Sequence, residues 1–139
     1  MADKKHILII DDDPMMQRIM GAKLAKAGYE VMYSQDPAAG REMARRFMPD
    51  LILLDIRMPG ETGFSVAKLL HEEERTKNIP VIFLTNEDLS FEGEQWAREK
   101  WVVDYIHKSI DPNEFLKKVQ KYVPGGDSAS GEEKLVMPK

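Results

Sequence analysis

The chain contains no cysteine, no long hydrophobic run and no cluster of basic residues. Without cysteine, a disulfide framework and thiolate chemistry are excluded, and the composition fits a reducing compartment. The longest apolar stretches are strand-length, and no positively charged start leads into a signal-type core. Lysine and arginine are scattered and the net charge is -4, so no basic stripe indicates nucleic-acid binding. We therefore expect a cytoplasmic protein that binds neither membranes nor nucleic acid directly.

The length of 139 residues fits a single domain. A chain of this size buries roughly two thirds of the surface that its unfolded form exposes, so it needs no covalent staple. From residue 124 onward the sequence is rich in glycine, serine and glutamate. We therefore predict a domain over residues 1–123 and a flexible tail or linker stub over 124–139.

Strand-length apolar runs alternate with helical patterns along this domain. The expected strands are His6–Ile10, Glu30–Ser34, Leu51–Asp55, Pro80–Thr85 and Val102–His107. Helical patterns follow each of them, and the fourth, over 86–100, has few apolar anchors. This alternation predicts an α/β fold with right-handed crossovers: a five-stranded parallel sheet covered on both faces by five helices. The expected strand order is 2-1-3-4-5, the flavodoxin-like doubly wound arrangement.

An Asp-Pro pair precedes three of the helical patterns, at Asp13, Asp36 and Asp111. Proline suits the first helical position, and the preceding aspartate can cap the helix, so Asp13 is interpreted as a cap rather than a ligand. Gln17 is interpreted as completing a capping box with Asp13. The apolar positions expected on the buried face of this first helix are Met16, Ile19, Met20, Leu24 and Ala27.

Polar residues stand where four of the expected strands end: Asp11 and Asp12, Asp55, Thr85, and Lys108. In an open parallel sheet, ligands bind outside the carboxyl ends of the strands, so these side chains should converge. Three neighbouring carboxylates raise each other's pKa and favour cations nearby. Oxygen ligands without histidine or cysteine suit a hard ion that keeps several waters, which is how Mg²⁺ is usually held. Such a carboxylate, with an ammonium and a hydroxyl beside it, is equipped to attack phosphorus.

In these features the sequence resembles the receiver domains of two-component response regulators. The resemblance runs from about His6 to Val123 and rests on paired acids after the first strand, on an Asp-x-x-Met-Pro-Gly-x-x-Gly loop at Asp55 to Gly63, and on the strand-end Thr85 and Lys108. It implies a phosphorylation-dependent signalling switch rather than an enzyme. Asp55 then corresponds to the phosphoacceptor, which takes its phosphoryl group from a histidine kinase or a phosphotransfer protein.

The resemblance also implies roles for the residues around Asp55. Asp12, Asp55 and the backbone carbonyl of Arg57 would ligate Mg²⁺, and Asp11 would hold it mainly through water. Thr85 would hydrogen-bond one phosphoryl oxygen and Lys108 would pair with another.

Tyr105 matches the family's switch aromatic, whose inward rotation accompanies a movement of the switch residue Thr85 and reshapes the face made by the fourth helix, the fifth strand and the fifth helix. That face would bind a downstream protein effector. The protein would be a monomer or a phosphorylation-linked dimer.

The sequence departs from the family pattern in several places. Ser109 stands where the family has a proline in a cis bond, and because a cis bond to a non-proline residue costs about 3 kcal/mol, we predict a trans Lys108–Ser109 bond. Trp101-Val102 replaces the usual Gly-Ala. Asn86 stands where the family has a small residue and would crowd the phosphoryl site. Arg57 and Glu87 flank the site, and we hypothesise that they pair over the phosphoryl group and slow its hydrolysis.

Three other interpretations stay open on the sequence. In a phosphatase of the haloacid dehalogenase type, Asp11-x-Asp13, Thr85 and Lys108 would be the motifs, although no acidic metal pair follows Lys108 and no cap domain is visible. A degenerate receiver would bind partners without phosphorylation. The chain could also be the receiver of a longer regulator.

Overall fold

The computed structural model describes residues 4–86 and 102–124. The strands are β1 (His6–Ile10), β2 (Glu30–Ser34), β3 (Leu51–Asp55), β4 (Val81–Thr85) and β5 (Asp104–His107). The helices are α1 (Pro14–Lys26), α2 (Pro37–Phe47), α3 (Gly63–Glu72) and α5 (Pro112–Tyr122). Residues 87–101 lie outside the described part, and with them Glu87, Trp101 and the fourth helix expected over 86–100, apart from its first residue. The tail after residue 124 lies outside it too. None of the described helices has the length and hydrophobicity that a membrane span requires.

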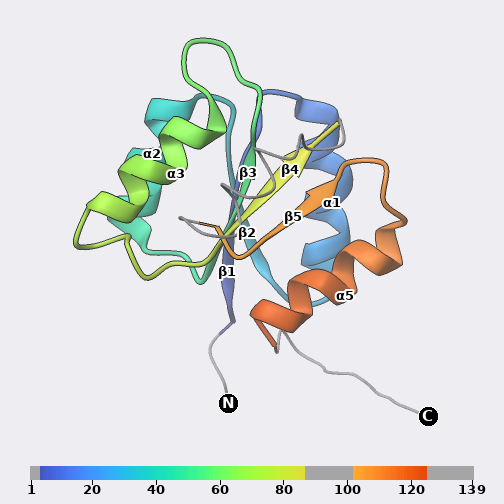
Figure 1. The fold of residues 1–139 in the computed structure, drawn as a ribbon. Coiled ribbons are helices and arrows are strands. Elements are labelled where there is room, and N and C mark those ends of the chain that lie inside the picture. The colour runs from blue at the N-terminus through green and yellow to red at the C-terminus, as the bar shows by residue number, and fades with distance from the viewer. Residues whose placement is uncertain (1–3, 87–101, 125–139) are drawn as a thin grey trace.

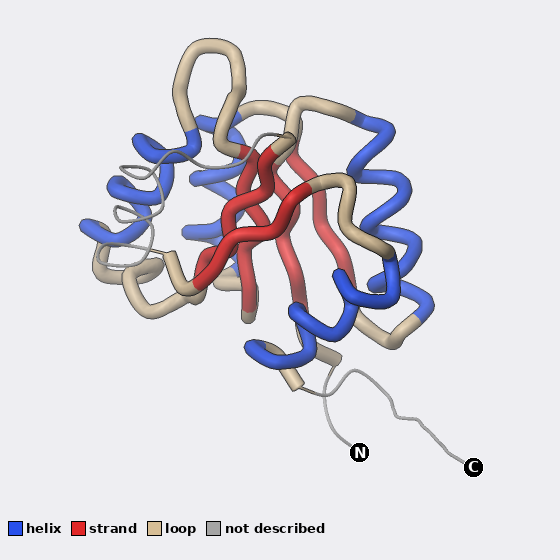
Figure 2. The backbone as a smooth tube through the Cα atoms, turned by 45° about the vertical axis from the view of Figure 1, so that its right-hand side comes forward, coloured by secondary structure: helices blue, strands red, loops and turns tan. Residues whose placement is uncertain are grey.

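The strands form one parallel sheet in the order β2-β1-β3-β4-β5, which confirms the predicted winding. Helices α2 and α3 cover one face of the sheet, and α1 and α5 cover the other (Figure 1). The same two layers are visible in the turned view, with the strands between them (Figure 2). The described part of the chain contains four of the five expected helices.

Every residue of β3 is buried, which explains its continuous apolar sequence. Side chains alternate between the two faces of a strand. Ile52 and Leu54 accordingly belong to the core under α2 and α3, whereas Leu51 and Leu53 belong to the core under α1 and α5. Side chains therefore pack against both faces of β3, and Asp55 is the last residue of this buried strand.

The three Asp-Pro helix starts are confirmed as caps. Asp13 accepts from the Met15 N–H at 3.0 Å, Asp36 from the Ala39 N–H at 2.8 Å, and Asp111 from the Asn113 N–H at 2.9 Å. The predicted capping box at Gln17 is wrong. Gln17 lies one position beyond the box's third helical residue, and its amide donates instead to the backbone carbonyls of Asp11 and Ser34.

Two other local predictions are corrected. The last strand begins at Asp104 rather than Val102, because the register that pairs Asp104 with Ile82 sets Val102 opposite Pro80, which has no N–H for the ladder. Ile19, expected on the buried face of α1, is 49% exposed. The buried face of α1 consists of Gln17, Met20, Gly21 and Leu24.

Candidate functional site

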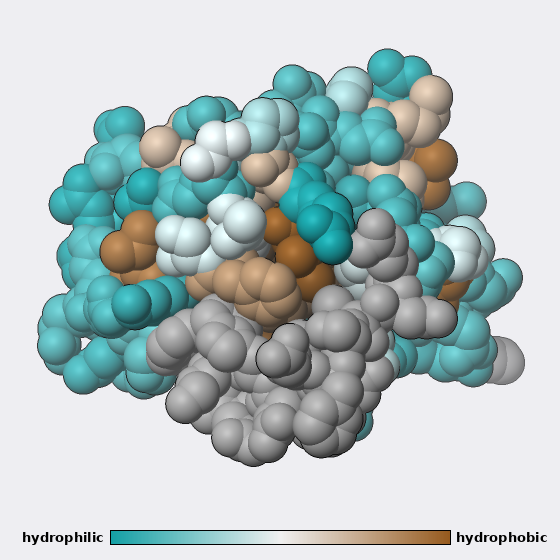
Figure 3. Space-filling view, turned by 45° about the horizontal axis from the view of Figure 1, so that its top comes forward, coloured by the Kyte–Doolittle hydropathy of each residue, from teal (hydrophilic) through white to brown (hydrophobic). Residues whose placement is uncertain are grey.

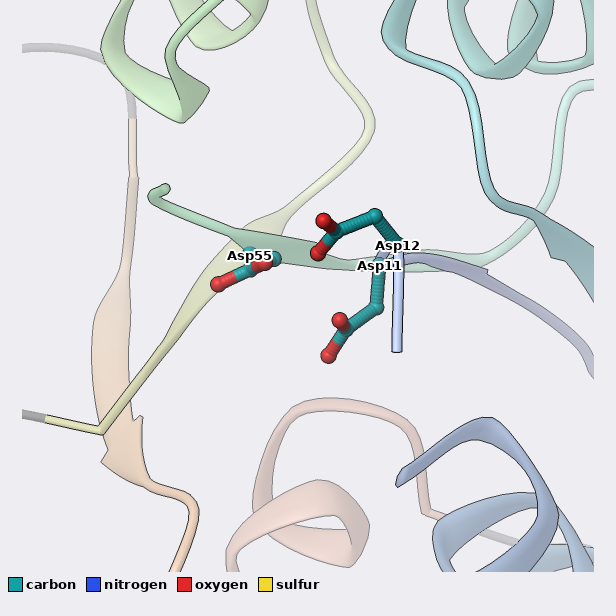
Figure 4. A group of neighbouring side chains, drawn as sticks. All are labelled: Asp11, Asp12 and Asp55. Carbon is teal, nitrogen blue, oxygen red and sulfur yellow. The ribbon is translucent and has the colours of Figure 1, made fainter. Parts of the chain in front are cut away.

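The candidate site lies at the carboxyl ends of the central strands. Asp11 and Asp12 follow β1, Asp55 ends β3, Thr85 ends β4 and Lys108 follows β5. Asp11 and Asp55 are buried, and Asp12 is exposed. Figure 4 shows the carboxylates of Asp11 and Asp12 extending to the side on which Asp55 lies. One oxygen from each of the three lies within 4.8 Å of the others.

Lys108 joins the acids of β1 and β3. Its Nζ atom lies 2.8 Å from Asp11 Oδ2 and 3.4 Å from Asp55 Oδ1, and the lysine side chain is only 4% exposed. The Lys108 N–H donates to the Thr85 carbonyl at 2.7 Å, which joins the ends of β4 and β5. The backbone bond therefore fixes where the lysine follows β5, and the two ion pairs hold its ammonium against the carboxylates.

The pKa of Asp55 is strongly raised. Burial, and then the charge of Asp11, raise the pKa of Asp55 from 3.8 to about 7, although the Lys108 ammonium opposes the shift. Burial would lower the pKa of Lys108, but the carboxylates of Asp11 and Asp55 outweigh it, and the net effect raises the pKa of Lys108. At neutral pH Asp55 is thus close to the point where it gains or loses a proton.

A cavity of about 300 Å³ opens over this cluster. Its lining consists of Asp12, Asp13, Asp55, Arg57, Thr85, Asn86 and Lys108. A small polyanion such as a phosphoryl group fits a space of this size. The described surface turned forward in Figure 3 is mostly hydrophilic, with small hydrophobic patches.

The predicted site residues occupy different positions relative to this cavity. Asp12, Asp55, Thr85 and Lys108 line it, together with the flanking Arg57 and Asn86. Asp11 is fully buried and does not line the cavity. Tyr105 does not line it: this half-buried side chain packs against the core under α2 and α3. Glu87, the partner predicted for Arg57, lies outside the described residues.

The donor set fits Mg²⁺. All three acids offer oxygen, which a hard divalent ion prefers. Asp11 Oδ2 is buried and accepts no well-aligned hydrogen bond from the described residues, and Lys108 meets it only as an ion pair. A divalent cation between these acids would relieve the repulsion that raises the pKa of Asp55.

Gly63 lets α3 start against the strand that carries Asp55. A Cβ atom at Gly63 would lie 2.5 Å from the Asp55 carbonyl oxygen, a contact that only glycine avoids. The Gly63 N–H donates to the Ile56 carbonyl at 2.7 Å, and the Arg57 N–H approaches Asp55 Oδ1 at 3.4 Å. The Met-Pro-Gly loop is thereby folded back onto the end of β3.

Ser109 makes contacts that a proline could not make. Its N–H donates to His107 Nδ1 at 3.1 Å, and its Oγ atom lies 2.8 Å from the same nitrogen. No peptide bond in the described part of the chain is cis, so the Lys108–Ser109 bond is trans, as predicted. The His107–Ser109 pair thus closes the turn that carries Lys108.

Gln17 is the residue of this region that sequence reasoning placed wrongly. It is 7% exposed and lies on the buried face of α1, one turn before Met20. A polar residue at a buried position of an amphipathic helix was the available signal, because such a group needs hydrogen-bond partners. Its partners belong to the ends of β1 and β2, which the sequence alone does not bring together.

The sheet order and the acidic cavity define a doubly wound α/β domain with its site at the carboxyl edge of the sheet. The family model described as "Response regulator receiver domain" matches residues 7–120. The chain belongs to this family. Receiver domains are signalling regulators rather than enzymes in the usual sense. They interact with histidine kinases and downstream effectors, and the family typically binds Mg²⁺ at its acidic pocket.

Relatives of two lengths match the chain. Protein PilH of Pseudomonas aeruginosa is 34% identical over 120 residues, which cover 86% of this chain and 98% of PilH. The transcriptional regulator RpaA of Synechocystis, described as DNA-binding, is 37% identical over 115 residues, which cover 83% of this chain but 47% of RpaA. The match therefore covers nearly all of one relative and about half of the other.

Solved structures of receivers superpose closely. The chemotaxis protein CheY4 of Vibrio cholerae has a TM-score of 0.81 at 28% identity, and the match covers 86% of this chain and 99% of CheY4. The receiver domain of the sensor histidine kinase PA1611 from Pseudomonas aeruginosa has a TM-score of 0.78 at 27% identity, over 87% of this chain and 98% of that domain. The PA1611 structure holds a magnesium ion in its active-site cleft.

Proposed function

We propose that the chain is a phosphorylation-dependent switch that accepts a phosphoryl group on Asp55 from a histidine kinase or a phosphotransfer protein. The observation that carries this proposal is the position of Asp55: it ends a fully buried strand, borders the cavity, and lies 3.4 Å from the Lys108 ammonium. An Asp55 carboxylate oxygen forms the new bond to phosphorus. The bond from phosphorus to the donor's imidazole nitrogen breaks, and its electron pair stays on the imidazole.

The surrounding residues stabilise the charge that this transfer moves. Asp12, Asp55 and the Arg57 carbonyl would hold Mg²⁺, with Asp11 contributing through water, and the ion would neutralise the phosphoryl oxygens. Lys108 pairs with one of these oxygens and the Thr85 hydroxyl donates to another. Once a phosphoryl group draws Lys108 toward itself, the Lys108–Asp11 ion pair at 2.8 Å has to rearrange.

The transfer is read out through Tyr105 and the neighbouring surface. Tyr105 lies on β5, where it pairs with Phe83 of β4. It is three residues before Lys108 in the sequence. On the α5 side, Tyr122 donates to Asp104 at 2.9 Å, and Lys118 lies 3.8 Å from Asp104. We infer that this β5–α5 surface, with the expected fourth helix, binds a downstream protein effector. Binding would involve a monomer or a phosphorylation-linked dimer.

We propose that the switch comprises residues 1–123 and that residues 124–139 form a tail or linker stub.

Two other functions compete with this proposal. The phosphatase alternative has lost its support, because the chain belongs to the receiver family and Asp13, the second acid of that motif, caps α1. The degenerate receiver is the remaining competitor, and the intact acidic cluster favours phosphorylation over it.

Incubation with Mg²⁺ and acetyl phosphate, followed by intact mass measurement, tests the proposal. Wild type should gain the mass of one phosphoryl group, and both Asp55→Asn and magnesium-free wild type should gain none. Asp50→Asn is the matched control, because Asp50 precedes the same strand at its opposite end and should leave labelling unchanged. An unlabelled wild type that still binds Mg²⁺ would instead support the degenerate receiver.

A further inference from the structure

Gln17 is a buried amide that binds the backbone beneath the acidic cluster. Its Nε2 atom donates to the Asp11 carbonyl at 2.8 Å and to the Ser34 carbonyl at 3.0 Å. An amide NH₂ group has two hydrogens, so each carbonyl receives one. Gln17 therefore fastens the end of β1 to the end of β2 through a side chain of α1.

The Asp11 carbonyl belongs to the peptide group that links Asp11 to Asp12. The Asp11 N–H donates to the Ser34 carbonyl at 3.0 Å, and Asp11 Oδ1 accepts from the Asp13 N–H at 2.9 Å. Gln17 supplies the bond to the carbonyl side of this peptide. Because a peptide group is planar, fixing its carbonyl also fixes where the Asp12 backbone leaves it.

Packing alone does not account for a glutamine at this position. The other residues of the buried face of α1 are Met20, Gly21 and Leu24, which bury no polar side-chain group. Burying an amide is unfavourable unless its hydrogen bonds are made, and here one donor is used on the peptide between Asp11 and Asp12 and the other on the end of β2.

We infer that Gln17 is a positioning residue that sets the Mg²⁺ affinity of the site by fixing the Asp11–Asp12 peptide. This inference rests on the proposed function, since it assumes that Asp11 and Asp12 face the ion. Gln17 itself contacts neither the ion nor the phosphoryl group. It acts on ligand geometry in the way that outer-shell hydrogen bonds do in metal sites, where their loss weakens binding about 10–100-fold.

Gln17→Met tests this role because it keeps the length of the side chain and removes both donors. Met20→Ala is the matched control, one turn further along α1, where it removes buried volume from the core under α1 and α5. Mg²⁺ affinity is measured by titration calorimetry on each full-length variant, at a temperature where urea unfolding shows it to be folded. Gln17→Asn, which keeps an amide that is too short to reach both carbonyls, replaces Gln17→Met if the methionine variant does not fold.

We expect the Gln17 variant to bind Mg²⁺ about tenfold more weakly or worse. Met20→Ala should lose stability and keep wild-type affinity. A Gln17 variant with wild-type affinity would overturn the inference, and so would an equal loss in Met20→Ala, because that would reflect general loosening of α1. If wild type itself failed to bind Mg²⁺, the proposed function would fail, a result distinct from the failure of the Gln17 role alone.

Discussion

Replacing Asp55 with asparagine should stabilise the metal-free protein at alkaline pH. The folded state raises the pKa of Asp55 from 3.8 to about 7, so folding takes up a proton between these values. By linkage, stability falls as the pH rises through this window, because the folded state binds more protons than the unfolded state. Asparagine has the same shape and does not titrate, so the variant avoids this loss.

The size of the effect follows from the shift. At 1.36 kcal/mol per pKa unit, a shift of about 3 units corresponds to at most about 4 kcal/mol at pH 8. This figure already includes the attraction of the Lys108 ammonium, which lies 3.4 Å from Asp55 Oδ1. The buried asparagine amide has to find its own hydrogen-bond partners and keeps only part of the gain, so we expect a net stabilisation of about 2 kcal/mol, or a rise in Tm of about 6–10 °C. The advantage should shrink to less than about 1 kcal/mol near pH 4, where Asp55 of folded wild type is protonated and that of the unfolded chain is only about half ionised.

Urea unfolding followed by circular dichroism, at a series of pH values in EDTA, measures this difference. Glu72→Gln, which removes one negative charge from the exposed end of α3, controls for net charge and should show no such pH dependence. A variant no more stable than wild type at alkaline pH would refute the reasoning, as would an advantage that persists unchanged in acid. Adding Mg²⁺ should stabilise wild type more than Asp55→Asn.

Three further predictions concern the same edge of the sheet. Mg²⁺ affinity should fall as the pH drops through about 7, by up to about tenfold per pH unit, because protonated Asp55 is a poor ligand. Calorimetric titration at several pH values tests this. An affinity that does not change with pH would contradict the raised pKa of Asp55. Gly63→Ala should lower the free energy of unfolding by about 1–3 kcal/mol, because the new Cβ would lie 2.5 Å from the Asp55 carbonyl oxygen; an unchanged urea midpoint would show that α3 can shift freely. Arg57→Ala should speed loss of the phosphoryl group by about three- to tenfold, because Arg57 is proposed to hinder the water that attacks it. This change corresponds to up to about 1.4 kcal/mol in the barrier to hydrolysis. An unchanged decay rate, followed by mass measurement, would end that hypothesis.

Local rules were sufficient for much of the fold. The three Asp-Pro starts needed only capping chemistry, and the apolar run before Asp55 needed only the two-sided burial of a central parallel strand. Convergence of the acids with Lys108 followed from the rule that parallel strands end at one edge. Each of these depends on residues close in sequence or on a general property of the sheet.

The remaining features depend on contacts between distant segments. Gln17 resembled part of a cap because its partner at the end of β2 is 17 residues away. Val102 resembled a strand residue because nothing local shows that it faces Pro80. The raised pKa of Asp55 arises only when burial and Asp11 act together.

Locating the phosphoryl group along the chain tests the central claim most directly. Borohydride reduction of the protein treated with acetyl phosphate converts a phosphorylated aspartate to homoserine, which peptide mass mapping then assigns to a residue. We predict homoserine at position 55 alone, dependent on Mg²⁺. Homoserine at Asp11, the acid that a haloacid dehalogenase would use, or none in a protein that binds Mg²⁺, would contradict the account.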